Sequence, residues 1–151
     1  MTSLCLIRQA VRNDIPALCW MLDQLRQETV WRSIPVESDY TYAAEQFEWM
    51  ILDPDHFIAV AELDGEQVGM VGGMIRRYPF LCTVPYVNEW ALWVAPAHRR
   101  HGVGSVLWRR MVEWGKQKGA LGAMYGRPKA VSHVGSNVVI EEMVWHYWGT
   151  P

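Results

Sequence analysis

The sequence predicts a mixed α/β protein in which helices pack on one β-sheet. The first observation is the order of hydrophobic patterns: strand, two helices, a strand meander, a helix, a strand and a short β-rich end. The second is that strands and helices do not alternate regularly, which excludes a doubly wound sheet. The third is composition. Half of the residues are hydrophobic and 20% are charged, and a chain of 151 residues predicts one globular domain over residues 1–151.

The first part of the chain predicts a strand and two helices. Residues 4–11 are apolar enough for a strand, and Asn13 or Asp14 is placed to cap a helix that runs to about Glu28. After a loop over 29–38, Ser38 or Asp39 caps a second helix that ends at Asp53-Pro54. Each helix has an apolar stripe at helical spacing: Ile15, Leu18, Leu22 and Leu25, then Ala43, Phe47, Met50 and Ile51.

A strand meander follows these helices. The β-patterned runs 56–63 and 67–78 flank Asp64-Gly65, a pair that favours a tight hairpin because the turn needs positive φ. Glycines in the second run predict a bulge or a close backbone approach. Residues 78–85 are expected to be a connection, and 86–95 a strand buried on both faces.

The last third of the chain predicts a turn, a helix and further strands. Pro96 ends the preceding strand, and 105–119 predicts a helix whose apolar side includes Leu107 and Met111. Residues 120–126 predict a fifth strand. The remaining end, 127–151, is short and atypical: 138–148 predict one or two strands and 129–137 a short helix or a loop.

Charge and cysteine content exclude several classes of protein. The formal net charge of −2 gives no global basic field, so neither nucleic acid nor a membrane is an expected partner. Cys5, Cys19 and Cys82 form no CxxC pair, so no zinc site or disulfide framework is indicated, and all three are expected to be buried thiols. The start of the chain lacks the pattern of a signal peptide, and no apolar run is long enough to span a bilayer. A cytoplasmic protein is therefore expected.

The turn between the fourth strand and the third helix combines positive charge with backbone freedom. A helix N-terminus exposes free N–H groups with partial positive charge, and glycine lets an anion approach them. The turn therefore predicts a pyrophosphate cradle, with a basic surface loop as the alternative. Neither a Rossmann fingerprint nor a Walker A loop is present. The residues expected to form the cradle are Gly102, Val103, Gly104 and Ser105, with Arg99, Arg100 and His101 as countercharge.

The segment VAPAHRRHGVG (94–104) resembles motif A of the GNAT superfamily of N-acetyltransferases, V-x-P-x-x-[R/Q]-x-x-G-x-[G/A]. Arg99, Gly102 and Gly104 occupy its signature positions. The order of elements and the opening RQAVRNDIPAL are also similar, and the resemblance covers residues 4–126. It implies a mostly antiparallel sheet with flanking helices, whose fourth and fifth strands splay apart at a bulge.

The resemblance implies acetyl-CoA as cosubstrate and no metal. In the family, amides of the loop corresponding to Arg99–Gly104 hold the pyrophosphate, and Ser105 stands where a hydroxyl often assists. The backbone of Leu92, Trp93 and Val94 is expected to pair with the pantetheine arm. Trp93 and Val94 would flank the thioester carbonyl, where a backbone N–H meets the developing oxyanion.

Two residues are expected to handle protons. The acceptor amine must lose a proton before it reacts, and Glu89, a carboxylate in an apolar strand, is the expected general base, directly or through a water that Asn88 orders. The alternative for Glu89 is a strand-end carboxylate in solvent or in an ion pair. The family's tyrosine segment after the fifth strand is missing, so Tyr125 is the expected general acid. Further candidates are Tyr147, Ser132 and His133.

The acceptor is expected opposite the CoA, between the 29–38 loop, the 76–86 connection and the C-terminal strands. These segments carry aromatic and acidic side chains that suit a cationic amine or are ordinary surface: Trp31, Tyr78, Phe80, Tyr86, Glu28, Glu37 and Asp39. The tail MVWHYW (143–148) is a candidate homodimer surface, since exposed aromatic clusters often mark interfaces.

These features together predict an acetyl-CoA-dependent N-acetyltransferase. It would move an acetyl group to a primary amine, on a small molecule or a peptide, by direct transfer in a ternary complex. The alternative is a non-catalytic acyl-CoA-binding GNAT-like module that acts in sensing or assembly. An interaction protein that has lost the cofactor is disfavoured because the phosphate loop is complete.

Overall fold

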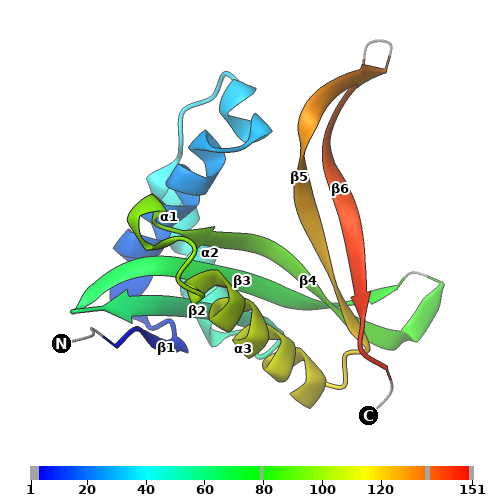
Figure 1. Ribbon diagram of the computed structural model, residues 1–151. Helices are drawn as coiled ribbons and strands as arrows, with labels where there is room; N and C mark the ends of the chain where they lie inside the picture. The colour runs from blue at the N-terminus through cyan, green and yellow to red at the C-terminus, as the bar shows by residue number, and fades with distance from the viewer. Residues whose placement is uncertain (1–3, 79, 135–136, 150–151) are drawn as a thin grey trace.

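The computed structural model describes residues 4–78, 80–134 and 137–149 (Figure 1). Its elements follow the predicted order. They are β1 (Leu6–Gln9), the 3-10 helix η1 (Arg12–Asp14), α1 (Ile15–Gln27), η2 (Val30–Ser33), α2 (Tyr40–Leu52), β2 (His56–Leu63), β3 (Glu66–Tyr78), β4 (Leu81–Val94), η3 (Pro96–His98), α3 (Val103–Gln117), β5 (Gly122–Val134) and β6 (Asn137–Tyr147).

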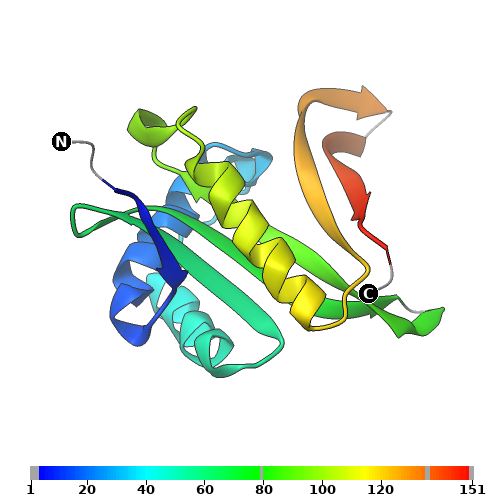
Figure 2. The same ribbon diagram turned by 60° about the horizontal axis from the view of Figure 1, so that its bottom comes forward.

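The strands form one sheet in the order β1-β2-β3-β4-β5-β6. Neighbouring strands are antiparallel except β4 and β5, which are parallel. One face of the sheet packs against α3 and the other against α1 and α2 (Figure 2). The β5–β6 hairpin stands away from the rest of the sheet (Figure 1). The predicted mixed fold, with its splayed fourth and fifth strands, is confirmed.

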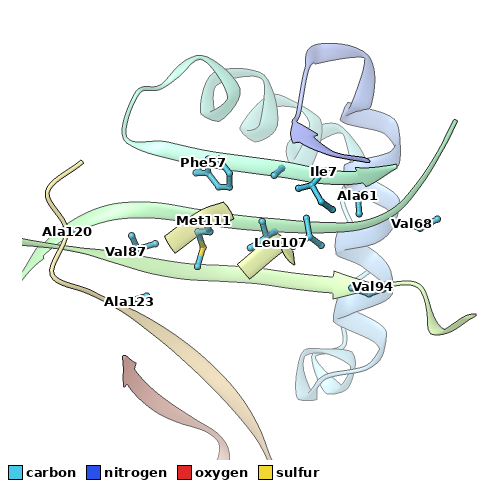
Figure 3. Close-up of a cluster of buried hydrophobic side chains, with 12 residues drawn as sticks. Ile7, Phe57, Ala61, Val68, Val87, Val94, Leu107, Met111, Ala120 and Ala123 are labelled. Atoms are coloured by element: carbon cyan, nitrogen blue, oxygen red, sulfur yellow. The ribbon is translucent and has the colours of Figure 1, made fainter. Parts of the chain in front are cut away.

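Two apolar clusters hold the helices on the sheet. On the α3 side, Leu107 and Met111 are both 0% exposed and lie among side chains of β1, β2 and β4 (Figure 3). Burying each such side chain contributes about 1.5–3 kcal/mol. On the other side, α1 and α2 bury an equivalent set against the sheet: Leu18, Met21, Phe47, Val60, Met70 and Trp93. The sheet is thus covered on both faces.

Local predictions at two turns are confirmed by backbone geometry. Asp64 and Gly65 have φ values of 51° and 86°, as a tight hairpin between β2 and β3 requires. Asp39 caps α2, because its Oδ1 accepts the N–H of Tyr42 at 2.9 Å. Residues close together in the chain determine both the turn and the cap.

Asp14 has a different role from the predicted one. No side chain caps α1, so the expectation for Asn13 or Asp14 is wrong. The Asp14 carboxylate is buried and accepts hydrogen bonds from Arg8 Nη1 and Nη2, at 2.7 and 2.9 Å, from Gln67 Nε2 at 3.0 Å and from the N–H of Val11 at 2.8 Å. Its pKa is lowered chiefly by the hydrogen bond from Arg8. The carboxylate therefore fastens β1 and β3 to the start of α1.

Several strand boundaries differ from the predicted ones. Residues 78–85 are not a connection, because β4 begins at Leu81 and its Pro85 pairs with Arg77. The segment 129–134 belongs to β5, not to a helix or loop, whereas 135 and 136 lie outside the described residues. A single strand, β6, covers most of 138–148, and α3 begins at Val103 rather than 105. Pairing between long strands extends these hairpins beyond what local composition indicates.

The cysteines are not equivalent. Cys19 is buried, as expected, but Cys5 is exposed because it precedes the short edge strand β1. The side chain of Cys82 lies outside the described residues. Within the described ranges, no helix has the length and apolarity to cross a membrane, and no cluster of three or more His, Cys, Asp or Glu could hold a metal ion.

Candidate functional site

A β-bulge in β4 sets the geometry of the site. Gly72 of β3 pairs with Ala91 and Gly73 with Glu89, so Trp90 is an extra residue without a partner in β3. Its indole lies flat on Gly72, where an added Cβ would be 2.5 Å from Cε2 of Trp90. The extra residue resets the alternation of side chains along β4. Before the bulge, Val87 faces the α3-side core, whereas after it Ala91 faces the α1 and α2 side.

The strands β4 and β5 separate at this bulge. Their pairing comprises Val87 with Ala123 and Asn88 with Met124, and from Glu89 onward β5 turns away (Figure 1). A cleft of about 960 Å³ opens there between β4, β5, β6, α3 and the start of the α1–α2 connection. Its lining is Leu25, Thr29, Trp31, Asn88, Glu89, Trp90, Ala91, Leu92, Gly104, Ser105, Trp108, Arg109, Val112, Tyr125, Gly126, Met143 and His146.

The two predicted catalytic residues line this one cleft from opposite strands. Glu89 is half-buried on β4, next to Asn88. Tyr125 projects from β5, and its ring meets Trp108 of α3 edge to face at 4.9 Å between centroids. The roles of Glu89 and Tyr125 in proton transfer stay predictions.

The other proposed proton donors are placed differently. Tyr147 is 60% exposed and does not line the cleft. Ser132 and His133 belong to the backbone of β5, but their side chains lie outside the described residues. His146, which sequence reasoning missed, does line the cleft and meets Trp108 at 6.4 Å between ring centroids. The pairing of His146 with Ala123 puts it there, and that register was not readable from the sequence.

The loop before α3 presents a row of free backbone donors. Arg100 and Gly102 both have left-handed φ, 65° and 82°, so the chain curves and its N–H groups converge. Within the part of the chain described, the N–H groups from Arg100 to Ser105 donate no hydrogen bond, and no side chain caps α3. An added Cβ on Gly102 would meet no atom within 4 Å. Donors, open space and the α3 dipole together fit an anionic diphosphate.

Arg99 is engaged by the protein itself. Its Nε donates to the carbonyl of Val94 at 2.7 Å, and its Nη2 lies 2.8 and 2.6 Å from the two carboxylate oxygens of Glu28. Glu28 also accepts the indole N–H of Trp93 at 3.3 Å. Arg99 therefore holds the loop in place, while Arg100 and His101 are exposed and available as countercharge. Glu28 was expected on the acidic rim of the acceptor site, but it instead pairs with Arg99 and so helps to hold the loop before α3 in place.

The three expected pantetheine-contacting residues of β4 differ in where their side chains lie. Leu92 lines the cleft, but the side chains of Trp93 and Val94 are only 3% and 9% exposed, in the two opposite cores. Any contact of Trp93 or Val94 with a bound molecule in this cleft therefore falls to the backbone, and the expected pairing with a pantetheine arm stays a prediction. Beyond Asn88 no pair with β5 occupies this edge of β4 among the described residues.

Only some of the residues predicted for the acceptor side line the cleft. Trp31 and Thr29 line the cleft from the α1–α2 connection, and Leu25 lines it from α1. Tyr86 packs edge to face on Trp145, at 5.7 Å between centroids, and neither it nor Phe80 lines the cleft. The side chain of Tyr78 lies outside the described residues.

The structure thus combines a sheet that opens at a bulge with a donor-rich helix N-terminus beside the opening. Residues 22–130 match the model of the acetyltransferase (GNAT) family. The chain belongs to the GNAT acetyltransferase family.

Solved structures with the same fold are diverse. A transcriptional regulator from Bacillus halodurans is 20% identical, with a TM-score of 0.69 and 83% of each chain covered. The acetyltransferase AAC(6')-Iy in complex with a bisubstrate analogue is 22% identical, with a TM-score of 0.68, covering 82% of this chain and 79% of that one. A predicted acetyltransferase from Clostridium acetobutylicum with acetyl-CoA is 16% identical, with a TM-score of 0.69 and coverage of 81% and 80%.

Proposed function

We propose that the protein is an acetyl-CoA-dependent N-acetyltransferase that moves an acetyl group to a primary amine by direct transfer in a ternary complex. The observation that carries this proposal is the cleft in which Gly104 and Ser105 of the first turn of α3, the unpaired edge of β4 and Glu89 meet. Similar folds bound to acetyl-CoA or to a CoA bisubstrate analogue support it.

The chain offers separate groups for each part of acetyl-CoA. The N–H groups of Gly102 to Ser105 would hold the pyrophosphate, with Arg100 and His101 as countercharge. The backbone of Leu92 to Val94 would pair with the pantetheine arm. When bound, acetyl-CoA supplies an activated acetyl thioester that a neutral amine can take directly.

The cleft supplies a base and an acid on opposite walls. Glu89 accepts the proton that the ammonium form of the acceptor must lose, with Asn88 positioning a water between them. Tyr125 holds a hydroxyl proton on its Oη and donates it to the leaving thiolate. Apolar side chains of the cleft, including Trp90 and Trp108, lie beside these groups.

Binding of acetyl-CoA and CoA by isothermal titration tests the proposal. We expect Gly102→Glu to abolish binding, because a carboxylate on the cradle repels the diphosphate. Gly119→Glu is a matched control, since Gly119 also has a left-handed φ, 80°, and open space, but follows the opposite end of α3. Absence of binding by the wild type would overturn the proposal.

Turnover separates the enzyme from the non-catalytic alternative. We expect Glu89→Gln to lower kcat by at least about 100-fold while the Kd of acetyl-CoA is unchanged. Glu113→Gln, at an exposed position of α3, is the control. Acetyl-CoA binding without turnover across an amine panel would instead favour an acyl-CoA-binding module in sensing or assembly.

Formation of a homodimer remains a prediction, and exposed aromatic and apolar side chains on β6 support it. Met143, Trp145 and Tyr147 alternate along this edge strand and are 56%, 45% and 60% exposed. Sedimentation velocity of the wild type and of Tyr147→Glu tests it. A monomeric wild type would contradict it.

A further inference from the structure

A second cavity adjoins the cleft on its acceptor side. It has a volume of about 390 Å³ and lies between α1, the α1–α2 connection and the start of α2. Leu25, Trp31 and Trp90 line both this cavity and the cleft. The two spaces are therefore adjacent, and Trp90, the neighbour of Glu89 in the chain, is one of the three side chains that they share.

The wall of this cavity is mainly apolar. Leu22, Leu25 and Ala43 contribute from the helices, and Ile34 and Val36 from the connection. The last two are 42% and 64% exposed, and Trp31, Tyr40 and Tyr42 around them are 49%, 44% and 59% exposed. Apolar surface left exposed around one concave site is typical of a ligand pocket.

Most polar side chains in the cavity wall form hydrogen bonds with residues of the α1–α2 connection or the start of α2. Asp23 accepts hydrogen bonds from the hydroxyls of Ser38 and Tyr40, the latter at 2.8 Å. Arg26 donates to the carbonyls of Ile34 and Val36 and, at 3.3 Å, to Ser38 Oγ. These contacts shape the wall and leave its apolar side chains facing the space.

Trp90 forms a rigid floor for the cavity. Its ring lies against Gly72 on one side and tilts against Phe47, at 6.0 Å between centroids. The bulge that places Glu89 in the cleft thus also places an aromatic surface beside it. A rigid aromatic floor beside the proposed base suits an acceptor with an apolar body.

We propose that the acceptor is a primary amine that carries an aromatic or bulky apolar group. The apolar group sits over Trp90 in this cavity, and the amine nitrogen reaches Glu89 in the cleft. This inference rests on the proposed function and narrows its substrate class. The wall also holds the carboxylates of Asp23, Glu37 and Asp39; Asp23 accepts the hydroxyls of Ser38 and Tyr40, and Asp39 accepts the N–H of Tyr42, so preference for a polycationic acceptor is the outcome that competes with this inference.

Steady-state acetylation of three amines tests the inference. The probes are 2-phenylethylamine, ethylamine and the aminoglycoside neamine, with release of the CoA thiol as the readout. We expect kcat/KM for 2-phenylethylamine to exceed that for ethylamine at least roughly tenfold, since burial of the phenyl ring favours binding. Equal values, or a preference for neamine, would overturn the inference.

Two exposed apolar positions give a matched pair of variants. Ile34→Asp puts a charge on the cavity wall, and Leu52→Asp does so at the end of α2, where Leu52 is 83% exposed and lines neither space. We expect Ile34→Asp to raise KM for 2-phenylethylamine at least roughly tenfold and to leave kcat and the values for ethylamine unchanged. Equal effects of the two variants would contradict the inference.

Binding measurements without turnover distinguish a failure of the substrate class from a failure of the proposed function. Titration of 2-phenylethylamine into the wild type and Ile34→Asp reports the cavity without turnover, and titration of acetyl-CoA reports the cradle. Acetyl-CoA binding and acetylation of ethylamine, without preference for 2-phenylethylamine, would overturn only the substrate class. Failure to bind acetyl-CoA would overturn the proposed function and, with it, the acceptor assignment.

Discussion

Arg99 and Glu28, 71 positions apart in the chain, form an ion pair that joins the loop before α3 to the end of α1. The same guanidinium holds the carbonyl of Val94, and the same carboxylate accepts the indole N–H of Trp93. Glu28 immediately precedes the connection that lines the acceptor side. The proposed acetyl-CoA loop and the proposed acceptor wall therefore share one anchor.

Removing either partner of this pair should weaken acetyl-CoA binding to a similar extent. Both side chains are about 40% exposed (42% and 40%), so solvent screens the pair and its contribution is about 1 kcal/mol or less, roughly fivefold in Kd. We expect Arg99→Ala and Glu28→Gln each to raise the Kd measured by titration, and the double variant to be no worse than either. Tighter binding by Glu28→Gln would instead make Arg99 a countercharge that Glu28 restrains.

The two motif glycines should differ in what they tolerate. Gly102 has a left-handed φ of 82°, where a side chain costs about 1 kcal/mol or more, although the space beside it is open. Gly104 has no such φ, and an added Cβ would be 3.7 Å from Val94 Cγ2. We expect Gly102→Ala to lower the free energy of unfolding by about 1 kcal/mol and Gly104→Ala to leave it unchanged or raise it, because alanine favours helix. Urea denaturation of both variants checks this order, and equal losses would contradict it.

The parts of the fold that sequence predicted correctly depend on neighbours in the chain. The Asp64-Gly65 turn, the Asp39 cap and the apolar stripe of α3 each arise within a few residues. Local chemistry, together with the motif, therefore sufficed for the element order.

The features that sequence missed depend on register between distant segments. A bulge in the fourth strand was expected from the family resemblance, but its position at Trp90 follows from the pairing of Gly72 and Gly73 with the residues on either side of it. His146 enters the cleft through its pairing with Ala123, and the Asp14 side chain, although Asp14 is the N-cap residue of α1, binds Arg8 and Gln67 instead of the helix. Apart from Arg8, six residues before Asp14, these partners lie far apart in the chain, so no local pattern indicates them.

The buried Asp14 cluster should make stability depend on pH. The hydrogen bond from Arg8 lowers the folded-state pKa of Asp14 below its usual value of 3.8. Its stabilising contribution is therefore complete above about pH 5 and is lost as the pH falls through the unfolded and then the folded pKa. We expect Asp14→Asn to lower the free energy of unfolding by about 3 kcal/mol at pH 7, and the difference from wild type to shrink toward pH 3. Urea denaturation across this range checks it, with Glu45→Gln, at an exposed position, as the control. A difference that is constant with pH would contradict the assignment.

The contact of Gly72 with Trp90 should couple stability to acceptor binding. A methyl group on Gly72 would be 2.5 Å from Cε2 of the indole, which is rigid and cannot move aside without disturbing the bulge. We expect Gly72→Ala to lower the free energy of unfolding by about 1–3 kcal/mol and to raise KM for 2-phenylethylamine.

A double-mutant cycle with Trp90→Ala isolates this contact. Once the indole is gone, the methyl group meets no ring, so Gly72→Ala should cost little in the Trp90→Ala background. Urea denaturation of the four proteins gives the coupling energy. Strictly additive losses would show that Gly72 is needed for the strand itself and not to seat Trp90, and the aromatic floor of the acceptor cavity would then need another explanation.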